Sequence, residues 1–376
     1  MKQILKRHLA LMAVLWMVLS SACAERATSI FVATDRHATY ETEKVQENQK
    51  AVPVRGEDGS LTWHNHLTEV LEKVREDDQA LQPSAVLLGG DFVGEGADSA
   101  LDGEGNPIGQ PAFTMEEVQE EIRSVLGDGV RTFFTYGSHD LREAGAYSDV
   151  FLSGPAACDG YYIYGISYSQ MIYGTDAQAA AAGYTGKDLD DPNGISAESA
   201  SRNFLEWVSG LSDHQPIIFM THVPMHANRG DNLGTKYWLE ALKTACEDHD
   251  IIVVWGHNHS SEDRKATRKV EQAVYLVPRG GTMSVQTWTE NEKGEAVIRQ
   301  KNNKLMTEKP ELGFTYMNAG YITLGFGTLL TFRDVNDDGT WDEVQFKRYS
   351  ISGDGEAEFG MTGLPSPYVL ELRSFQ

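Results

Sequence analysis

Five short apolar runs along the chain each end in a polar cluster that contains aspartate or histidine. Their β-branched and aromatic content is typical of buried strands. The runs cover residues 30–33, 85–88, 132–135, 216–220 and 251–255. The clusters that follow them are Asp35-Arg36-His37, Gly90-Asp91, Gly137-Ser138-His139-Asp140, Thr221-His222 and Gly256-His257-Asn258-His259. Loops that leave the carboxyl ends of strands in an open α/β fold converge on one crevice, so we expect the five clusters to meet at one site.

Helical periodicity appears between these runs. The apolar residues within 67–74 fall at a spacing that places them on one face of a helix. Residues 115–126 predict a second helix that begins after Thr114, and residues 204–211 predict a third. The alternation of strands and helices favours the α/β class.

Two further segments of the middle part are distinctive. Residues 161–168 predict a strand whose tyrosines pack in the core, and the lining of a substrate cleft is the alternative for the same side chains. Residues 174–201 carry a run of alanines, several glycines and a proline, and we expect them to form an insertion.

The part after residue 267 predicts mostly strands, among them 274–277, 321–324 and 328–332. Residues Asp334 to Asp342 predict a tight turn between two strands. Their spacing also mimics the first half of a calcium-binding EF-hand loop, but Gln345 stands at the twelfth position, where such a loop needs a bidentate glutamate. A turn is therefore the favoured interpretation, and calcium at Asp334–Asp342 is the alternative.

The N-terminus has the pattern of a signal peptide over residues 1–24. Basic residues precede an apolar stretch, 9–19, that is too short to span a bilayer as a helix. Cleavage after Ala24 would release a soluble protein, whereas cleavage before Cys23 would leave a lipid-anchored cysteine, which the scarcity of cysteine slightly favours. We expect an exported bacterial protein that is periplasmic, secreted or anchored as a lipoprotein.

Composition is that of a globular enzyme, with 41% hydrophobic and 10% aromatic residues. We expect one long domain over residues 28–351, with a β-rich part at 267–351, followed by a C-terminal segment at 352–376. The formal net charge of −23 repels polyanions and excludes nucleic acid polymers as partners. An oxidising compartment would allow a disulfide between Cys158 and Cys246, and two separate core thiols are the alternative.

The five clusters, in this order, resemble the calcineurin-like metallophosphoesterase superfamily over roughly residues 28–260. The pattern of that family is Asp-x-His, Gly-Asp, Gly-Asn-His-Asp/Glu, a lone His and Gly-His-x-His. The resemblance implies a four-layer α/β sandwich, in which helices flank two central mixed β-sheets and the site lies at the C-terminal ends of the strands. It also implies hydrolysis of small phosphomonoesters or phosphodiesters through a dinuclear metal-bound hydroxide.

The same resemblance implies a role for each cluster. Asp91 would bridge two divalent transition metal ions, for which the mixed ligands suit Mn, Zn or Fe. His139 would stabilise the transition state or protonate the leaving oxygen, and its neighbour Asp140 would orient it. The remaining ligands would be Asp35, His37 and His259 at the first metal, and His222 and His257 at the second.

Two positions depart from the family pattern. Ser138 stands where the family has an asparagine that ligates the second metal, so that site would be looser or completed by water. Gly94 stands where purple acid phosphatases have a tyrosine ligand, which argues against the iron(III)-tyrosinate chemistry of that branch.

Two residues after the fourth cluster are candidates for substrate binding. His226 and Arg229 follow His222 on the same predicted loop, and a guanidinium can fork a phosphate. The alternative to an esterase is a catalytically weak ligand-binding or envelope-associated protein of the same fold. Ser138 favours that alternative, and the otherwise full ligand set argues against it.

Overall fold

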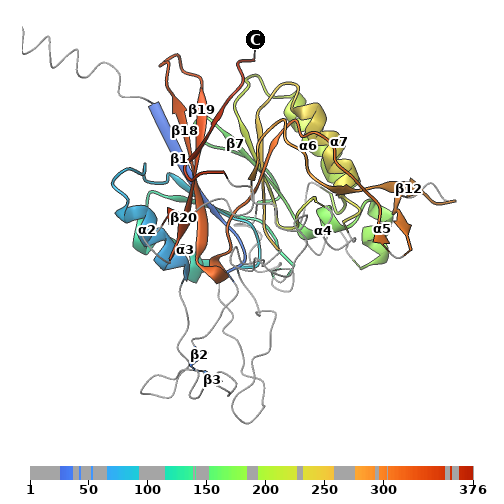
Figure 1. Ribbon diagram of the computed structural model, residues 1–376, viewed down its shortest axis with the longest axis horizontal. Helices are drawn as coiled ribbons and strands as arrows, with labels where there is room; N and C mark the ends of the chain where they lie inside the picture. Colours follow the sequence, from blue (N-terminus) through green and yellow to red (C-terminus); the bar gives the residue numbers. More distant parts are fainter. Residues whose placement is uncertain are drawn as a thin grey trace, which may run out of the picture.

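The chain folds around two β-sheets that stand face to face between helices (Figure 1). The computed structural model describes residues 26–36, 42–43, 52–53, 66–92, 115–138, 140, 152–183, 194–226, 232–257, 276–292, 296–302, 304–351, 356–357 and 364–375. Within these residues, no helix is long and apolar enough to cross a membrane.

The first sheet has seven strands in the order β20-β19-β18-β1-β4-β5, and β21 also pairs with β19. Strands β1, β4 and β5 run parallel to one another, and the other four strands pair antiparallel. The bounds are β1 Arg26–Ala33, β4 Ala85–Leu88, β5 Arg131–Phe134, β18 Phe326–Asp334, β19 Glu343–Ser350, β20 Glu356–Ala357 and β21 Tyr368–Glu371.

The second sheet has six strands in the order β10-β17-β9-β8-β7-β6. Its central strands β7, β8, β9 and β17 are parallel, whereas β6 and β10 pair antiparallel at the two edges. Parallel strands that are covered on both faces consist of continuous apolar residues, and β8 and β9 are buried throughout. The bounds are β6 Gly154–Ala157, β7 Tyr162–Ile166, β8 Ile217–Thr221, β9 Ile251–Trp255, β10 Leu276–Val277 and β17 Thr315–Asn318.

Helices cover the outer face of each sheet. Figure 1 shows α2 and α3 on one side of the molecule and α6 and α7 on the other, with both sheets between them. The four-layer α/β sandwich expected from the sequence is therefore confirmed. The bounds are α2 His66–Glu76, α3 Met115–Leu126, α4 Tyr168–Ile172, α5 Asp176–Ala181, α6 Ala197–Ser209 and α7 Thr235–Ala245.

Short strands form four separate two-stranded ribbons. Residues of β12 and β16 line a pocket together with α7, as described below. The bounds are β2 Thr42–Glu43, β3 Val52–Pro53, β11 Val285–Gln286, β12 Trp288–Glu290, β13 Ala296–Ile298, β14 Gln300–Lys301, β15 Lys304–Leu305 and β16 Thr307–Glu308.

Alternation along β1 explains how one strand serves two layers. Ile30 and Val32 pack in the cluster between the two sheets, together with Ile218 and Met220 of β8. Phe31 belongs to the cluster beneath α2 and α3. Successive side chains of a strand point to opposite faces, so an uninterrupted apolar strand is what two covered faces require.

The expectation of a strand at 321–324 is wrong. Ile322–Leu324 forms a short 3₁₀ turn, and Tyr321 makes only an isolated bridge with Thr34. The turn ends at Gly325, whose positive φ of 75° lets its N–H return to the carbonyl of Ile322. Apolar composition predicted the burial of this segment but not its tight turn.

The expected insertion at 174–201 is largely helical in the described part. Thr175 caps α5, and Ser196 caps α6, so that helix begins before the residues whose periodicity predicted it. In the expected C-terminal segment, β20 and β21 pair with β19 of the first sheet.

The turn at Asp334–Asp342 joins the antiparallel strands β18 and β19, as the favoured interpretation predicted. Its carboxylates accept hydrogen bonds from within the turn: Asp334 from the N–H groups of Asp338 at 3.1 Å and Gly339 at 2.8 Å, and Asp342 from Asn336. These contacts suffice to hold a tight turn.

Both described cysteines are free thiols. Cys158 packs against the cluster between the sheets, whereas Cys246 ends α7 in the cluster beneath α6 and α7. The two side chains therefore belong to different layers.

Candidate metal centre

The carboxyl ends of the parallel strands bring the described parts of all five clusters together. The backbone N–H of Asp35, after β1, donates to the carbonyl of Gly90, after β4, at 3.0 Å. The backbone of Gly256, after β9, donates to the carbonyl of His222, after β8, at 2.9 Å. Contacts between side chains then link the two sheets, as described next. Convergence at one edge, predicted from strand exits, is what the structure shows.

Three side chains form a group that could hold a metal ion. The ligand atoms of Asp91, His222 and His257 all lie within 4.8 Å of one another. Nε2 of His222 is 3.1 Å from Oδ2 of Asp91 and 3.1 Å from Nδ1 of His257. Asp91 and His222 are buried, and His257 is half-buried. Two imidazoles and a carboxylate are ligands that transition metals favour.

The hydrogen bonds of His222 show that this group fits a cation. Its Nδ1 lies 2.8 Å from the carbonyl oxygen of Gly89, which can only accept, so Nδ1 carries hydrogen. In the neutral ring Nε2 then has a lone pair that faces the carboxylate of Asp91. Nε2 of His222 and Oδ2 of Asp91 then repel each other unless a proton or a metal ion lies between them. A partner that fixes the far nitrogen of a ligand histidine is a common feature of metal sites.

Charge around His222 supports the same conclusion. Burial by itself would lower the pKa of His222, but the carboxylates of Asp91 and Asp35 and hydrogen bonds to Asp91 and Gly89 raise that pKa to about 10. Two buried carboxylates thus attract a positive charge to this position. A bound metal ion would supply that charge in place of the proton.

Asp35 adjoins the group and is held from several directions. Its Oδ2 accepts hydrogen bonds from Oγ1 of Thr34 at 2.5 Å and from the backbone N–H of His257 at 2.8 Å. Its backbone carbonyl accepts from the N–H of Thr323 at 2.9 Å, and the hydroxyl of Thr323 also donates to it. The sequence offered no signal for Thr323, which lies far along the chain.

Three of these candidate ligands have a left-handed backbone. The φ angles are 54° at Asp35, 57° at Asp91 and 67° at His257. Non-glycine residues adopt this conformation at an energetic cost, and such residues concentrate at functional sites. Each of the three lies just beyond a strand end. The left-handed backbone there reverses the direction of the chain and turns the side chain toward the other candidate ligands.

The glycine of the second cluster permits the close approach of neighbouring loops. Gly90 has a φ of 92°, and a Cβ atom there would lie 2.6 Å from Cα of Gly137 and 2.6 Å from Nδ1 of His222. Any side chain would therefore separate the second, third and fourth clusters.

Asp140 holds two of the clusters together through the backbone. Its Oδ2 accepts hydrogen bonds from the N–H groups of Asp91 at 2.6 Å and Gly137 at 2.8 Å, and its Oδ1 accepts from Phe92 at 3.1 Å. The carboxylate is buried and occupied by three donors. This arrangement favours a positioning role for Asp140, and its predicted role in orienting His139 stays a prediction.

Ser138 and Arg36 line the same loops. The hydroxyl of Ser138 donates to Oδ2 of Asp91 at 3.3 Å, so it contacts the carboxylate expected to bridge the metals. The buried guanidinium of Arg36 forms an ion pair with Glu121 of α3 at 2.6 Å, which anchors the first cluster to the helix layer.

The other predicted site residues fall into two sets. His37, His139, His259 and Arg229 lie outside the described residues. His226 is fully buried: its Nδ1 is 3.0 Å from the hydroxyl of Tyr316, and its ring packs edge-on against Trp255 at 4.9 Å. Burial favours packing for His226, and contact with substrate stays a prediction.

Tyr168 was grouped with the core tyrosines, but its position differs from theirs. Tyr161 and Tyr164 are buried in the core. Tyr168 is half-buried, and its ring centroid lies 6.2 Å from that of His257. Its place just beyond β7, on the carboxyl edge of the sheet, was the signal in the sequence that could have set it apart.

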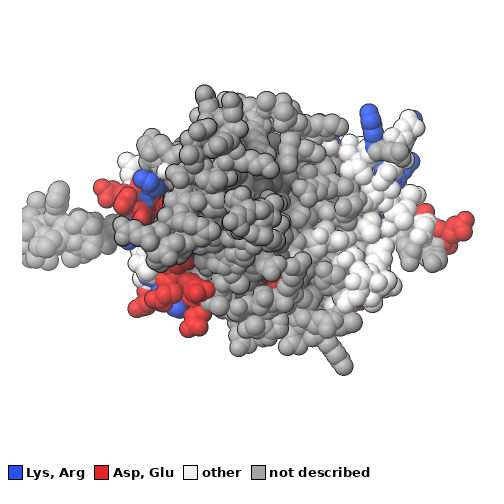
Figure 2. All heavy atoms as spheres, turned by 90° about the horizontal axis from the view of Figure 1, so that it is seen from below, with Lys and Arg blue, Asp and Glu red and all other residues white. Residues whose placement is uncertain are grey.

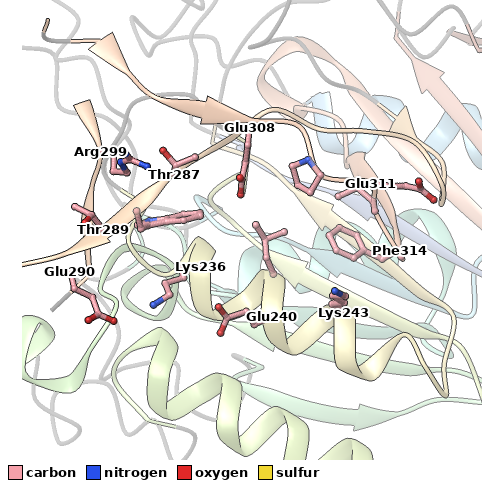
Figure 3. Close-up of a pocket in the computed structure, with 15 residues that line it drawn as sticks. Lys236, Glu240, Lys243, Thr287, Thr289, Glu290, Arg299, Glu308, Glu311 and Phe314 are labelled. Atoms are coloured by element: carbon pink, nitrogen blue, oxygen red, sulfur yellow. The ribbon is translucent and has the colours of Figure 1, made fainter. Parts of the chain in front are cut away.

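A large pocket lies away from the five clusters. It has a volume of about 700 Å³ and lies between α7 and the strands β12 and β16. Figure 3 shows Lys236, Glu240 and Lys243 of α7 facing Arg299 and Glu308 across it. Its lining shares no residue with the five clusters and mixes both charges, so we place the chemistry at the metal group.

Acidic side chains gather on the end of the molecule where α2 and α3 lie, as Figure 2 shows. The glutamates Glu116, Glu117 and Glu120 are exposed on α3.

Comparison with solved structures gives remote likenesses. NAD nucleotidase from Haemophilus influenzae is 13% identical with a TM-score of 0.32, over 88% of this chain and 54% of that one. A 5'-nucleotidase from Candida albicans is 11% identical with a TM-score of 0.37, over 89% and 55%. Phosphopantetheinyl hydrolase from Mycobacterium tuberculosis is 12% identical with a TM-score of 0.31, over 78% and 90%. The chain spans about half the length of both nucleotidases.

These likenesses are too weak to support an argument, so the assignment of the chain to a family rests on the family comparison. No curated protein matches the chain. The model of the calcineurin-like phosphoesterase family matches residues 29–261, which include all five clusters. The chain therefore belongs to the calcineurin-like phosphoesterase family.

Proposed function

We propose that this protein hydrolyses phosphomonoester or phosphodiester bonds of small molecules at a dinuclear metal centre. The observation that carries the proposal is the convergence of Asp91, His222 and His257 within 4.8 Å, with Asp35 hydrogen-bonded to the backbone of His257. Two buried carboxylates and two imidazoles at one sheet edge fit a pair of divalent ions better than one.

Asp91 is the proposed bridge, because its Oδ2 faces His222 while its backbone lies beside the first cluster. Asp35 would join His37 and His259 at the first ion, and His222 and His257 would hold the second beside Ser138. When bound, Mn, Zn or Fe ions neutralise the charge of the phosphate and lower the pKa of water enough for attack at neutral pH.

The other residues bind, orient and transfer protons. Gly89 fixes the tautomer of His222 through its carbonyl, and Asp140 fixes the backbone of Asp91. We assign His139 to protonation of the leaving oxygen and Arg229 to one side of the substrate phosphate.

The proposed substrates are small phosphate esters. A net charge of −23 repels polymers such as nucleic acids, whereas the local charge of the metals still attracts one phosphate. We also propose export, through the N-terminal signal at residues 1–24, with lipid attachment at Cys23 as the form to test.

A catalytically weak relative with the same metal centre is the second candidate. Ser138 favours it, since its hydroxyl donates to Asp91 and so competes with metal for that oxygen. The intact Asp91–His222–His257 group argues for catalysis.

Elemental analysis of the purified protein tests the proposal, together with hydrolysis assays on a panel of mono- and diesters with and without added Mn or Zn. We expect two metal equivalents and hydrolysis of at least one ester class that chelator abolishes. Metal-loaded protein that hydrolyses no ester in the panel would instead support the weak relative. The exposed Asp159, changed to asparagine, provides a matched control for a ligand variant, because its side chain is 87% exposed and it precedes β7, whereas the clusters follow the carboxyl ends of strands.

A further inference from the structure

We propose that Tyr168 forms one wall of the substrate site and selects phosphate esters that carry a planar ring close to phosphorus. This inference rests on the proposed function. Tyr168 is a specificity residue in this scheme, since it would touch the substrate but take no part in bond breaking.

The position of Tyr168 supports this role. Strand β7 ends at Ile166 and is parallel to β8 and β9, so Tyr168 emerges at the same sheet edge as His222 and His257. Its ring lies 6.2 Å from the His257 ring and is tilted by 58° to it. A group on a phosphate bound beside His257 would therefore lie within reach of the tyrosine ring.

Exposure singles out Tyr168 among its neighbours. Residues Ser167, Ser169, Gln170 and Met171 are buried, whereas Tyr168 is half-buried. One part of its side chain packs against the cluster beneath α6 and α7. The part that this cluster does not cover is the surface that we propose for the substrate.

The turn that carries Tyr168 is held rigidly. The N–H of Ser167 donates to Oε1 of Gln170 at 2.8 Å, and Nε2 of Gln170 donates to the carbonyl of Gly194 at 2.7 Å. The indole N–H of Trp238 donates to the carbonyl of Gln170 at 2.8 Å. A preorganised wall loses little conformational entropy when a ligand packs on it, so its shape can discriminate between ligands.

Aromatic chemistry sets the preferred class. Paired aromatic rings gain affinity beyond the area that they bury, which corresponds to roughly a two- to tenfold effect on binding. A saturated ring of similar size fills the same space without this gain. Esters with an aryl group or a similar flat ring should therefore bind better than their saturated counterparts.

Three phosphonates that resist hydrolysis test the inference by binding rather than turnover. Calorimetry on the Mn-loaded protein would compare phenylphosphonate, cyclohexylphosphonate and methylphosphonate. We expect phenylphosphonate to bind roughly two- to tenfold more tightly than cyclohexylphosphonate. Tyr168→Phe should keep this preference, whereas Tyr168→Leu and Tyr168→Met should remove it without changing the affinity for methylphosphonate.

Tyr237→Leu is the matched control, because Tyr237 is a half-buried tyrosine on α7 that contacts the same core cluster. It should keep the wild-type preference. Equal binding of the two ring compounds by the wild type, or an unchanged preference in Tyr168→Leu or Tyr168→Met, would overturn the inference alone. Wild-type protein that binds metal but no phosphonate and cleaves no ester would overturn the proposed function as well.

Discussion

The backbone N–H of His257 donates a hydrogen bond to Oδ2 of Asp35 across 2.8 Å. This bond joins the first cluster of the chain to the fifth and the first sheet to the second. The same carboxylate is a proposed metal ligand, so a metal that binds Asp35 also acts on the loop that carries His257. The candidate metal site is therefore built from residues of both sheets, which are hydrogen-bonded to each other there.

Asp91 should be the most damaging single ligand to lose, since it is the proposed bridge between both metals. We expect Asp91→Asn to lower turnover by about 10³-fold or more, because a bound metal supplies several kcal/mol of stabilisation. Metal content should fall at both positions. Steady-state kinetics and elemental analysis measure this, with Asp159→Asn as the unaffected control. Full occupancy with near-normal turnover would contradict a dinuclear centre.

Asp140→Asn should disturb the site through the backbone. An amide offers one accepting oxygen and places an NH₂ group against a backbone donor, which costs about 1–3 kcal/mol of folding stability. Metal affinity should fall by about 10- to 100-fold, as for other residues that orient ligands. Denaturant unfolding and metal titration test this. If metal affinity stayed normal while one limb of the pH–rate profile disappeared, Asp140 would act in proton transfer instead.

Ser138→Asn should tighten the second metal position. The longer amide reaches a metal beside His222 and His257, whereas the serine hydroxyl donates to Asp91. Activity of the variant should exceed that of the wild type at limiting Mn or Zn and match it at saturation. Titration of activity against free metal decides the matter: superimposable curves would show that serine is an adequate ligand.

His139→Ala should matter most for esters with basic leaving groups. A general acid accelerates such reactions by about 10² to 10⁴ and helps little when the leaving oxygen is already a good leaving group. The loss should therefore be large for alkyl phosphates and small for nitrophenyl phosphates. Comparable losses for both substrates would restrict His139 to electrostatic help or positioning.

The parts that could be predicted from sequence are those fixed by local pattern. Apolar runs predicted β1, β4, β5, β8 and β9, and the polar residues at their ends predicted the metal group. Strand 321–324 was predicted wrongly because apolar content cannot distinguish a buried strand from a buried turn.

Long-range partners could not be predicted at all. Thr323 holds Asp35, and three backbone N–H groups occupy Asp140, but these contacts exist only once distant segments have met. The half-buried position of Tyr168 likewise depends on the turn of α4 and on Trp238, which follows it far along the chain.

The pairing of β1 with β18 has a consequence for how the chain is made. β1 is the first described segment, yet its neighbour on one side, Phe326–Asp334, is synthesised much later. Until then β1 has an open edge of apolar residues, which is a template for aggregation. The folding unit therefore extends well beyond residue 261, where the family match ends. A fragment that stops at residue 261 would lack β18, so it should expose the edge of β1 and aggregate even though it contains all five clusters.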